Sequence, residues 1–172
     1  MILKSEFVSF YEETYQNLYA YLLTLIPNQM LAEDFCQEAF IKFLRKCPDD
    51  LKEDMRKNYL FSIARRLVFD YFRQKKLFMR YELKELKKSV QRSYEIESDL
   101  LSNSVLEKIM RKLKVKERDM VHLYYKEDLS QKEIATICKM KETSVKVLLK
   151  RYRDKMKEIA ESMDLTWGDI HD

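Results

Sequence analysis

The stretch that decides the fold is LSQKEIATICKMKETSVKVLLKRYRDKM, residues 129–156. Ser130 and Glu133 have the spacing of a capping box, which predicts a short helix running to about Cys138. Residues 139–141 then separate this helix from a longer amphipathic helix that is dense in Lys and Arg. This layout is typical of a helix-turn-helix, whose second helix enters the major groove of DNA. The alternative is an ordinary helical pair with a solvated basic face.

Glycine usage excludes most other folds. Gly168 is the one Gly among 172 residues, whereas β-hairpin turns, dinucleotide-binding turns and phosphate loops depend on glycine. The chain is therefore predicted to be all-α, with two small helical domains joined by a linker.

Cysteine count and hydropathy set the expected compartment. The three cysteines form no CxxC pair, which favours a reducing, cytoplasmic location and argues against a disulfide framework or a zinc site. We expect neither a metal nor a cofactor. We also expect no membrane insertion, because no apolar run approaches the roughly 18 residues of a membrane helix, and the N-terminus has no signal-peptide pattern.

Apolar periodicity predicts three helices in the first half of the chain and four in the second. The first three are expected at residues 5–26, 31–46 and 58–78, with a charged loop before the third. In the second of them Leu31, Phe35, Ala39, Phe40, Phe43 and Leu44 are expected to face inward. The last four are expected at residues 104–113, 116–126, 130–138 and 142–160, the first opening at a capping box, Ser104 and Glu107. The predicted organisation is a domain at 1–78, a linker at 79–103, a domain at 104–161 and an acidic tail at 162–172.

The charge is distributed unevenly along the chain. Residues 1–50 carry a net −4 and residues 162–172 a net −3, whereas residues 51–101 carry +5 and residues 102–161 carry +6. Basic blocks behind an acidic start indicate two kinds of partner, a polyanion and something basic.

Aromatic and basic residues alternate in NYLFSIARRLVFDYFRQKK, residues 58–76. Phe61, Arg65, Phe69 and Arg73 are four residues apart and share one helix face. Aromatic rings beside guanidinium groups suit the unstacked bases of a single strand. The alternative is that Phe61 and Phe69 belong to the core.

The helix at 31–46 presents an acidic outward face. Its members are Glu33, Asp34, Gln37, Glu38 and Ile41. Such a face is commonly just solvated, but the apolar Ile41 favours a protein partner.

These three motifs, in this order, resemble a known family. AEDFCQEAF, residues 32–40, resembles region 2.2 of extracytoplasmic-function (ECF) sigma factors, and YLFSIARRLVFDYFRQKK, residues 59–76, resembles their regions 2.3–2.4. Residues 129–156 resemble region 4.2, and the likeness extends over about residues 5–160. It implies a σ2 domain, a linker and a σ4 domain that direct RNA polymerase core to promoters with −10 and −35 elements.

The resemblance also implies partners and roles for residues of this chain. The partners are bacterial RNA polymerase core (β′ clamp and β flap), promoter DNA and an anti-sigma factor. The residues placed against core polymerase are Asp34, Gln37, Glu38 and Ile41. Those placed at the −10 element are Asp50, Leu51, Lys52, Phe61, Arg65, Phe69, Arg73 and Lys76. Those placed at the −35 element are Lys141, Glu142, Thr143, Ser144, Lys146, Val147, Lys150, Arg151 and Arg153.

The chain departs from the family pattern in segments that read DNA. Lys139 stands where members often have Gly, Arg66 where Asn is usual, and Val147 where Ser is usual. A left-handed residue at Lys139 would cost about 1 kcal/mol relative to Gly. These departures bear on which DNA sequence is read more than on the activity.

Three other functional classes fit the sequence less well. The chain shows no paired-carboxylate or Ser/His/Asp spacing, so an enzyme is not expected. A helix-turn-helix regulator that acts without polymerase would use residues 1–78 for sensing or dimerisation and would not need the aromatic-basic helix at 58–76. An adaptor protein would not explain two separate basic domains.

Overall fold

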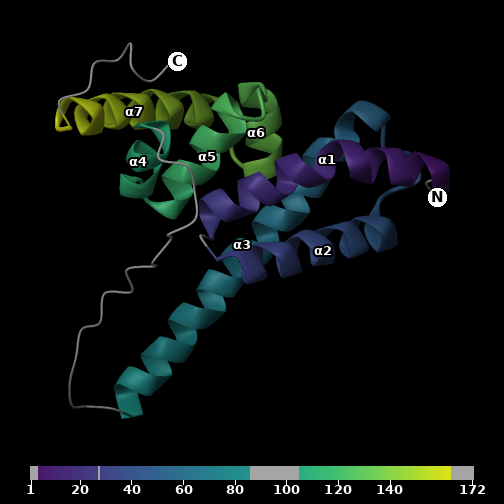
Figure 1. Ribbon diagram of the computed structural model, residues 1–172, viewed down its shortest axis with the longest axis horizontal. Helices are drawn as coiled ribbons and strands as arrows, with labels where there is room; N and C mark the ends of the chain where they lie inside the picture. The colour runs from purple at the N-terminus through teal and green to yellow at the C-terminus, as the bar shows by residue number, and fades with distance from the viewer. Residues whose placement is uncertain (1–3, 27, 86–104, 164–172) are drawn as a thin grey trace. The chain divides into compact units, whose positions relative to one another are not determined.

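The computed structural model describes residues 4–26, 28–85 and 105–163, and all regular structure in these ranges is α-helical (Figure 1). The helices are α1 (Lys4–Leu25), α2 (Gln29–Lys46), α3 (Glu53–Glu85), α4 (Val105–Lys112), α5 (Val115–Tyr125), α6 (Gln131–Cys138) and α7 (Glu142–Glu161). They form two compact units, one built chiefly from α1–α3 and the other from α4–α7. The predicted all-α class is confirmed.

Aromatic side chains hold the α1–α3 unit together. The ring of Phe10 on α1 stacks on that of Phe43 on α2, with centroids 4.9 Å apart. The ring centroids of Tyr21 on α1 and Phe61 on α3 are 5.1 Å apart. Phe43, Tyr21 and Phe61 are fully buried, and burial of each such ring stabilises a fold by about 1.5–3 kcal/mol. The three helices therefore share one core.

The ends of α2 are fixed by specific hydrogen bonds. The Asn28 side chain accepts from the Leu31 backbone N–H at 2.9 Å, which satisfies one of the free donors of the first turn. At the other end, the Tyr59 hydroxyl donates to the Lys46 carbonyl at 2.9 Å. The Asn28 cap explains why α2 begins at Gln29, two residues before the predicted start.

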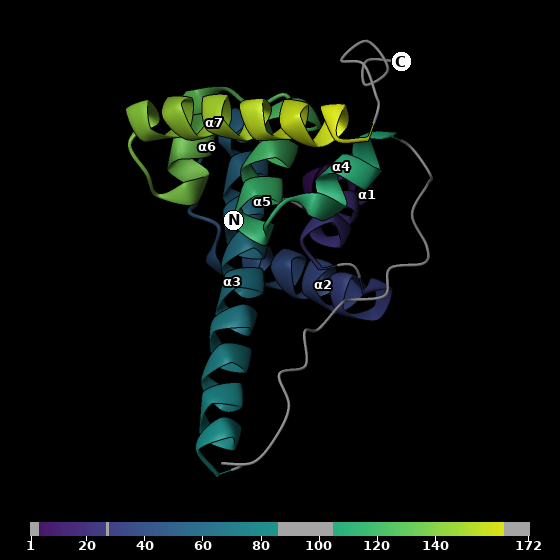
Figure 2. The same cartoon turned by 90° about the vertical axis from the view of Figure 1, so that its left-hand side faces the viewer.

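Helix α3 is longer than predicted at both ends. It runs for 33 residues, from Glu53, where a charged loop was expected, to Glu85, inside the predicted linker (Figure 2). Glu53 and Asp54 lie in its first turn, where carboxylates interact favourably with the helix dipole. The sequence of α3 contains neither Gly nor Pro to interrupt it. Residues 86–104 and 164–172, which hold the rest of the predicted linker, Ser104 of the first capping box and most of the tail, lie outside the described residues.

The α4–α7 unit surrounds a second apolar core. Its fully buried side chains include Ile109, Leu123, Ile134 and Val145, one from each helix. The predicted capping box at the start of α6 is present. The Ser130 backbone N–H donates to Glu133 Oε2 at 2.9 Å, and the Glu133 N–H donates to Ser130 Oγ at 3.3 Å.

A polar contact ties α7 to α5. The Lys155 ammonium lies 2.6 Å from Glu117 Oε2, and the same oxygen accepts from the Lys114 backbone N–H at 2.8 Å. Burial alone would raise the pKa of Glu117, but these two hydrogen bonds outweigh it and lower the pKa below its usual value. Glu117 therefore joins the start of α5 to the middle of α7 as a carboxylate.

Lys139 ends α6 and begins the break before α7. Its backbone is left-handed, with φ 54° and ψ 51°, as expected for a position where the family often has Gly. The Met140 N–H reaches back to the Ala135 carbonyl at 2.9 Å, which is a Schellman-type end to the helix. This turn sets the direction in which α7 leaves.

Candidate functional site

One face of α7 is buried and the opposite face is open to solvent. Val145, Leu149, Tyr152, Met156 and Ala160 form the buried stripe. At about 100° per residue, position 147 lies nearly opposite this stripe, and its side chain is 66% exposed. We call this surface the α7 outer face and define it as Thr143, Lys146, Val147, Lys150 and Arg151.

The residues predicted to read the −35 element are placed on this helix and just before it. All are exposed except Ser144, which is half-buried. Lys141 is the N-cap of α7, with extended backbone. Burial raises the pKa of Tyr125 on α5, and the nearby exposed Arg153 partly offsets that rise. The cations therefore surround the exposed first turns of α7, the part of a recognition helix that meets base edges.

A second candidate surface lies on α3. The Arg65 guanidinium carbon is 4.5 Å from the centre of the Phe69 ring, a cation–π contact. Arg73 and Lys76 continue this face at helical spacing and are exposed, and Arg73 also pairs with Asp70 at 3.0 Å. We call Arg65, Phe69, Arg73 and Lys76 the α3 aromatic-basic face.

Phe61 does not belong to this face. Its side chain is fully buried against Tyr21, so the expectation that it contacts DNA is wrong and the core alternative holds for it. Side chains spaced four residues apart do not stay on one face, because each such step carries the side chain about 40° further around the helix axis. Phe61 thus lies on the core side, while Phe69, two steps later, is half-buried at the edge.

The loop before α3 lies apart from the aromatic-basic face. Its Leu51 N–H donates to the Pro48 carbonyl at 3.1 Å. In this loop Asp50 and Lys52 are exposed and Leu51 is half-buried. Arg65 comes 12 residues after the first residue of α3, which is about 18 Å along the axis. The loop residues and the α3 face are therefore two separate contact points.

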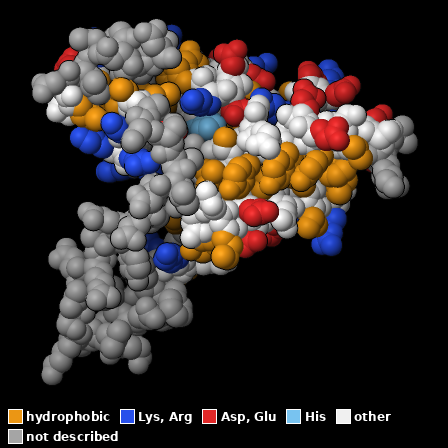
Figure 3. All heavy atoms as spheres, in the orientation of Figure 1, with side chains coloured by type: hydrophobic (Ala, Val, Ile, Leu, Met, Phe, Trp, Pro, Cys, Tyr) orange, Lys and Arg blue, Asp and Glu red, His pale blue; other side chains and the backbone are white. Residues whose placement is uncertain are grey.

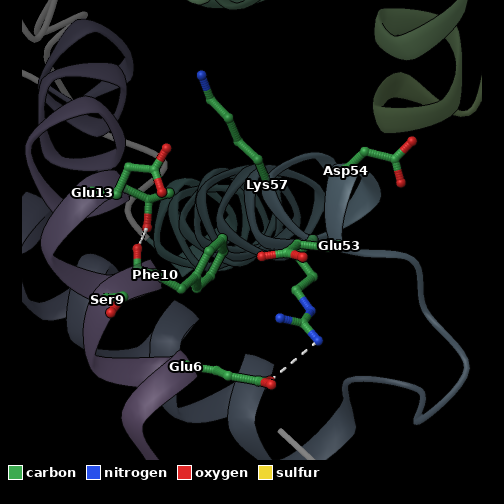
Figure 4. Close-up of a pocket in the computed structure, with 9 residues that line it drawn as sticks. Glu6, Ser9, Phe10, Glu13, Glu53, Asp54 and Lys57 are labelled. Carbon is green, nitrogen blue, oxygen red and sulfur yellow. Dashed lines mark hydrogen bonds and ion pairs between the residues drawn. The ribbon is translucent and has the colours of Figure 1, made fainter. Parts of the chain in front are cut away.

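A hollow of about 850 Å³ lies between the N-terminal parts of α1 and α3 (Figure 4). Four carboxylates line it, those of Glu6, Glu13, Glu53 and Asp54. Arg56 pairs with Glu6 at 3.6 Å across it. Arg56 and Lys57 are the two cations of the lining, so acidic side chains outnumber basic ones there.

The outward face of α2 is as acidic as predicted and more apolar. Glu33, Asp34, Gln37 and Ile41 are exposed, and Glu38 is paired with Lys42 at 2.7 Å. The expectation that Leu44 faces inward is wrong, because its side chain is 47% exposed. Met30 is 76% exposed and was not predicted to be part of this face. Met30, Ile41 and Leu44 are 11 and 3 positions apart, and this spacing is the signal that places them on one side of the helix.

An aromatic band on α1 was also missed. Tyr11, Tyr15 and Tyr19 follow one another at four-residue spacing, with ring centroids 5.2 and 6.1 Å apart. The Tyr11 ring lies 4.7 Å from that of Phe40 on α2. Figure 3 shows hydrophobic side chains in a band along α1. The repeated four-residue spacing of tyrosine in the sequence is the signal that could have found it.

The described residues hold no group of three or more His, Cys, Asp or Glu side chains arranged for a metal ion.

Burial, reinforced by Glu33, raises the pKa of the Cys36 thiol to about 12. Cys36 is therefore protonated at neutral pH and packs as an apolar side chain. Within the described ranges, no helix is both long enough and apolar enough to span a membrane.

Each of the two units matches a known family description. The family description "Sigma-70 region 2" matches residues 10–78, and "Sigma-70, region 4" matches residues 104–156. The chain belongs to the sigma-70 family, as an ECF-type sigma factor. It acts in transcription initiation as an alternative sigma factor. The match over residues 10–78 covers the part that a polymerase-independent regulator would use as a sensor, and so decides between the two alternatives.

One relative supports this assignment, and one solved structure shares the fold. The ECF RNA polymerase sigma factor SigM of Bacillus subtilis (strain 168) is 27% identical over 164 residues, covering 86% of this sigma factor and 93% of SigM. The sigma factor RpoE of Bartonella quintana, solved in complex with the anti-sigma factor NepR, matches with a TM-score of 0.68 at 20% identity, covering 90% of this chain and 96% of that one. The second likeness concerns the fold.

Proposed function

We propose that this sigma factor divides its work among the three surfaces described above. The outward face of α2 (Met30, Glu33, Asp34, Gln37, Glu38, Ile41 and Leu44) docks on core polymerase. The α3 aromatic-basic face holds the non-template strand of the −10 element, and the α7 outer face reads the −35 element. The observation that carries this proposal is the arrangement of α7, in which a buried stripe fixes the helix and the cations lie on the exposed side.

The chemistry of each surface suits its proposed partner. The α2 face combines exposed carboxylates with apolar side chains, which fits a basic protein surface such as the coiled coil of the β′ clamp. The Arg65–Phe69 pair offers a flat, cationic platform on which an unpaired base can stack. Lys146, Lys150 and Arg151 supply phosphate contacts around the α7 outer face.

The sigma factor works beside core polymerase in the cytoplasm, contributes no catalytic group of its own, and contacts the β flap through its α4–α7 unit. An anti-sigma factor controls it by covering polymerase- and DNA-binding surfaces. The complex of the structurally similar RpoE with the anti-sigma factor NepR supports this part of the proposal.

The test is reconstitution with bacterial core polymerase. The purified chain should co-elute with core and support transcription from a promoter selected from a random library. A variant with Lys146→Ala and Lys150→Ala should still co-elute but should transcribe poorly from duplex promoters. If the chain binds that DNA equally well without core, or fails to co-elute with core, the proposed division of labour is wrong.

A further inference from the structure

Val147 is an apolar side chain where α7 otherwise presents polar groups. It is 66% exposed, and among the large apolar side chains of the described residues only Met30 is more so. The exposed residues around it are Thr143, Lys146, Lys150 and Arg151. A β-branched residue lowers helix propensity slightly, and here it buries little against its own domain. The stability of the fold therefore does not explain it.

The position of Val147 on the helix points to a ligand. It is the sixth residue of α7, within the turns that a recognition helix presents to base edges. Thr143 lies one turn before it on the same face, and Lys146 and Arg151 lie on either side. A side chain held there by flanking phosphate contacts would meet the floor of the major groove.

The groove offers one strong chemical match. Valine has neither a donor nor an acceptor in its side chain, so it reads no hydrogen-bonding edge. The C5-methyl of thymine is the apolar group that the major groove displays. We infer that Val147 packs against a thymine methyl in the −35 element and makes this sigma factor prefer thymine at that step. The inference rests on the proposed role of the α7 outer face.

Deoxyuridine isolates this contact, because it keeps every hydrogen-bonding group of thymine and lacks only the methyl. Each thymine of the −35 element, on either strand of a selected promoter, is replaced in turn by deoxyuridine, and holoenzyme affinity is measured. At one position the wild type should bind roughly four-fold more weakly, the effect of exposing one methyl-sized group. Val147→Ser should bind the thymine and uracil duplexes equally at that position.

Two variants serve as matched controls. Thr143→Ser removes the neighbouring γ-methyl and keeps the hydroxyl, so loss of the thymine preference in this variant would assign the methyl contact to Thr143 and overturn the inference. Val8→Ser changes an exposed valine on α1 (45% exposed) and should leave the thymine-to-uracil ratio unaltered.

Several results would overturn the inference. These are a −35 element without thymine, equal binding of thymine and uracil at every position by the wild type, or an unchanged preference in Val147→Ser. If Val147→Ser instead weakens assembly with core, or weakens all DNA equally, Val147 contacts protein or backbone and not a base. If scrambling the whole −35 element leaves affinity unchanged, the proposed role of α7 itself has failed.

Discussion

The guanidinium of Arg65 lies over the ring of Phe69, one turn further along α3, at 4.5 Å from the ring centre. Each group holds the other in place, and together they form a flat surface that is both aromatic and cationic. A platform of this kind captures a base that has left the duplex stack, because every base has a π face.

Phe69→Ala should therefore impair promoter opening. Loss of one base–aromatic stack costs about 1–3 kcal/mol, so open-complex formation on duplex promoters should fall by roughly 5- to 150-fold. The effect should be smaller on a template with a pre-melted −10 bubble, and Phe69→Tyr should retain most activity. Full activity of Phe69→Ala on duplex templates would show that the ring only packs against its own helix.

The α2 face should govern affinity for core polymerase. Gln37→Ala with Glu38→Lys should weaken core binding by about tenfold, because charges at such a surface set association rate and orientation. Fluorescence titration with core measures the effect, and circular dichroism checks that the variant is folded. Gln16→Ala with Glu13→Lys makes the same chemical changes on α1 and should leave core affinity much closer to the wild type. Equal losses in the two variants would point to net charge and not to the α2 face.

Leu44 and its neighbour Phe43 give a direct test of which side of α2 is buried. Leu44→Ala should change the free energy of unfolding by less than about 0.5 kcal/mol, as for a surface substitution, whereas Phe43→Ala should cost about 3–5 kcal/mol. Leu44→Ala should also weaken core binding. A large loss of stability in Leu44→Ala would show that the Leu44 side chain is buried in the core.

Replacing Lys139, whose backbone is left-handed, by glycine should stabilise the folded protein. Lys139→Gly removes the steric penalty on the Cβ atom and should stabilise the protein by about 1 kcal/mol, seen as a higher urea midpoint. Lys139→Asn loses the same charge while tolerating the left-handed region, and so should stabilise by less. Lys139→Ala keeps the penalty, and a gain in Lys139→Ala equal to that of Lys139→Gly would mean that charge and not backbone conformation limits stability here.

Glu117 should make the α4–α7 unit sensitive to acid. Its pKa is lowered in the folded state, so the unfolded chain binds a proton more readily. The stability it contributes is fully present above the unfolded pKa of about 4.3 and is lost as the pH falls through the folded pKa.

Glu117→Gln should lower the free energy of unfolding at neutral pH by about 1 kcal/mol and should reduce the further loss at acid pH. Urea unfolding followed by circular dichroism between about pH 3 and 7 measures both effects. Glu158→Gln, which changes an exposed carboxyl on α7, should behave as the wild type. An acid dependence in Glu117→Gln identical to that of the wild type would contradict the assignment.

The elements that could be predicted from sequence are those with strong local signals. The Ser130–Glu133 box fixed the start of α6, and the stripe from Val145 to Met156 identified the buried side of α7, so the α7 outer face was found almost completely. The extent of α3 was missed because charged residues gave no apolar period to follow, although helix formation needs only the absence of a breaker and favourable end charges.

Side-chain placement depended on tertiary packing, which spacing alone does not settle. Phe61 and Phe69 belong to the same four-residue series, but only Phe61 meets Tyr21 and is buried. Leu44 follows Phe43 in an apolar run, and the packing of α1 and α3 covers only one of the two. The tyrosine series on α1 was not predicted as a surface feature, because its packing beside Phe40 of α2 depends on how α1 and α2 meet.

The uninterrupted course of α3 has a mechanical consequence. Its 33 residues span about 50 Å at 1.5 Å per residue, with neither Gly nor Pro to act as a hinge. Any twist applied where the chain leaves α3 at Glu85 is therefore transmitted to Arg65 and Phe69 as a rotation of the whole rod. The proposed strand capture at the −10 element would therefore depend on how the C-terminal end of α3 is held.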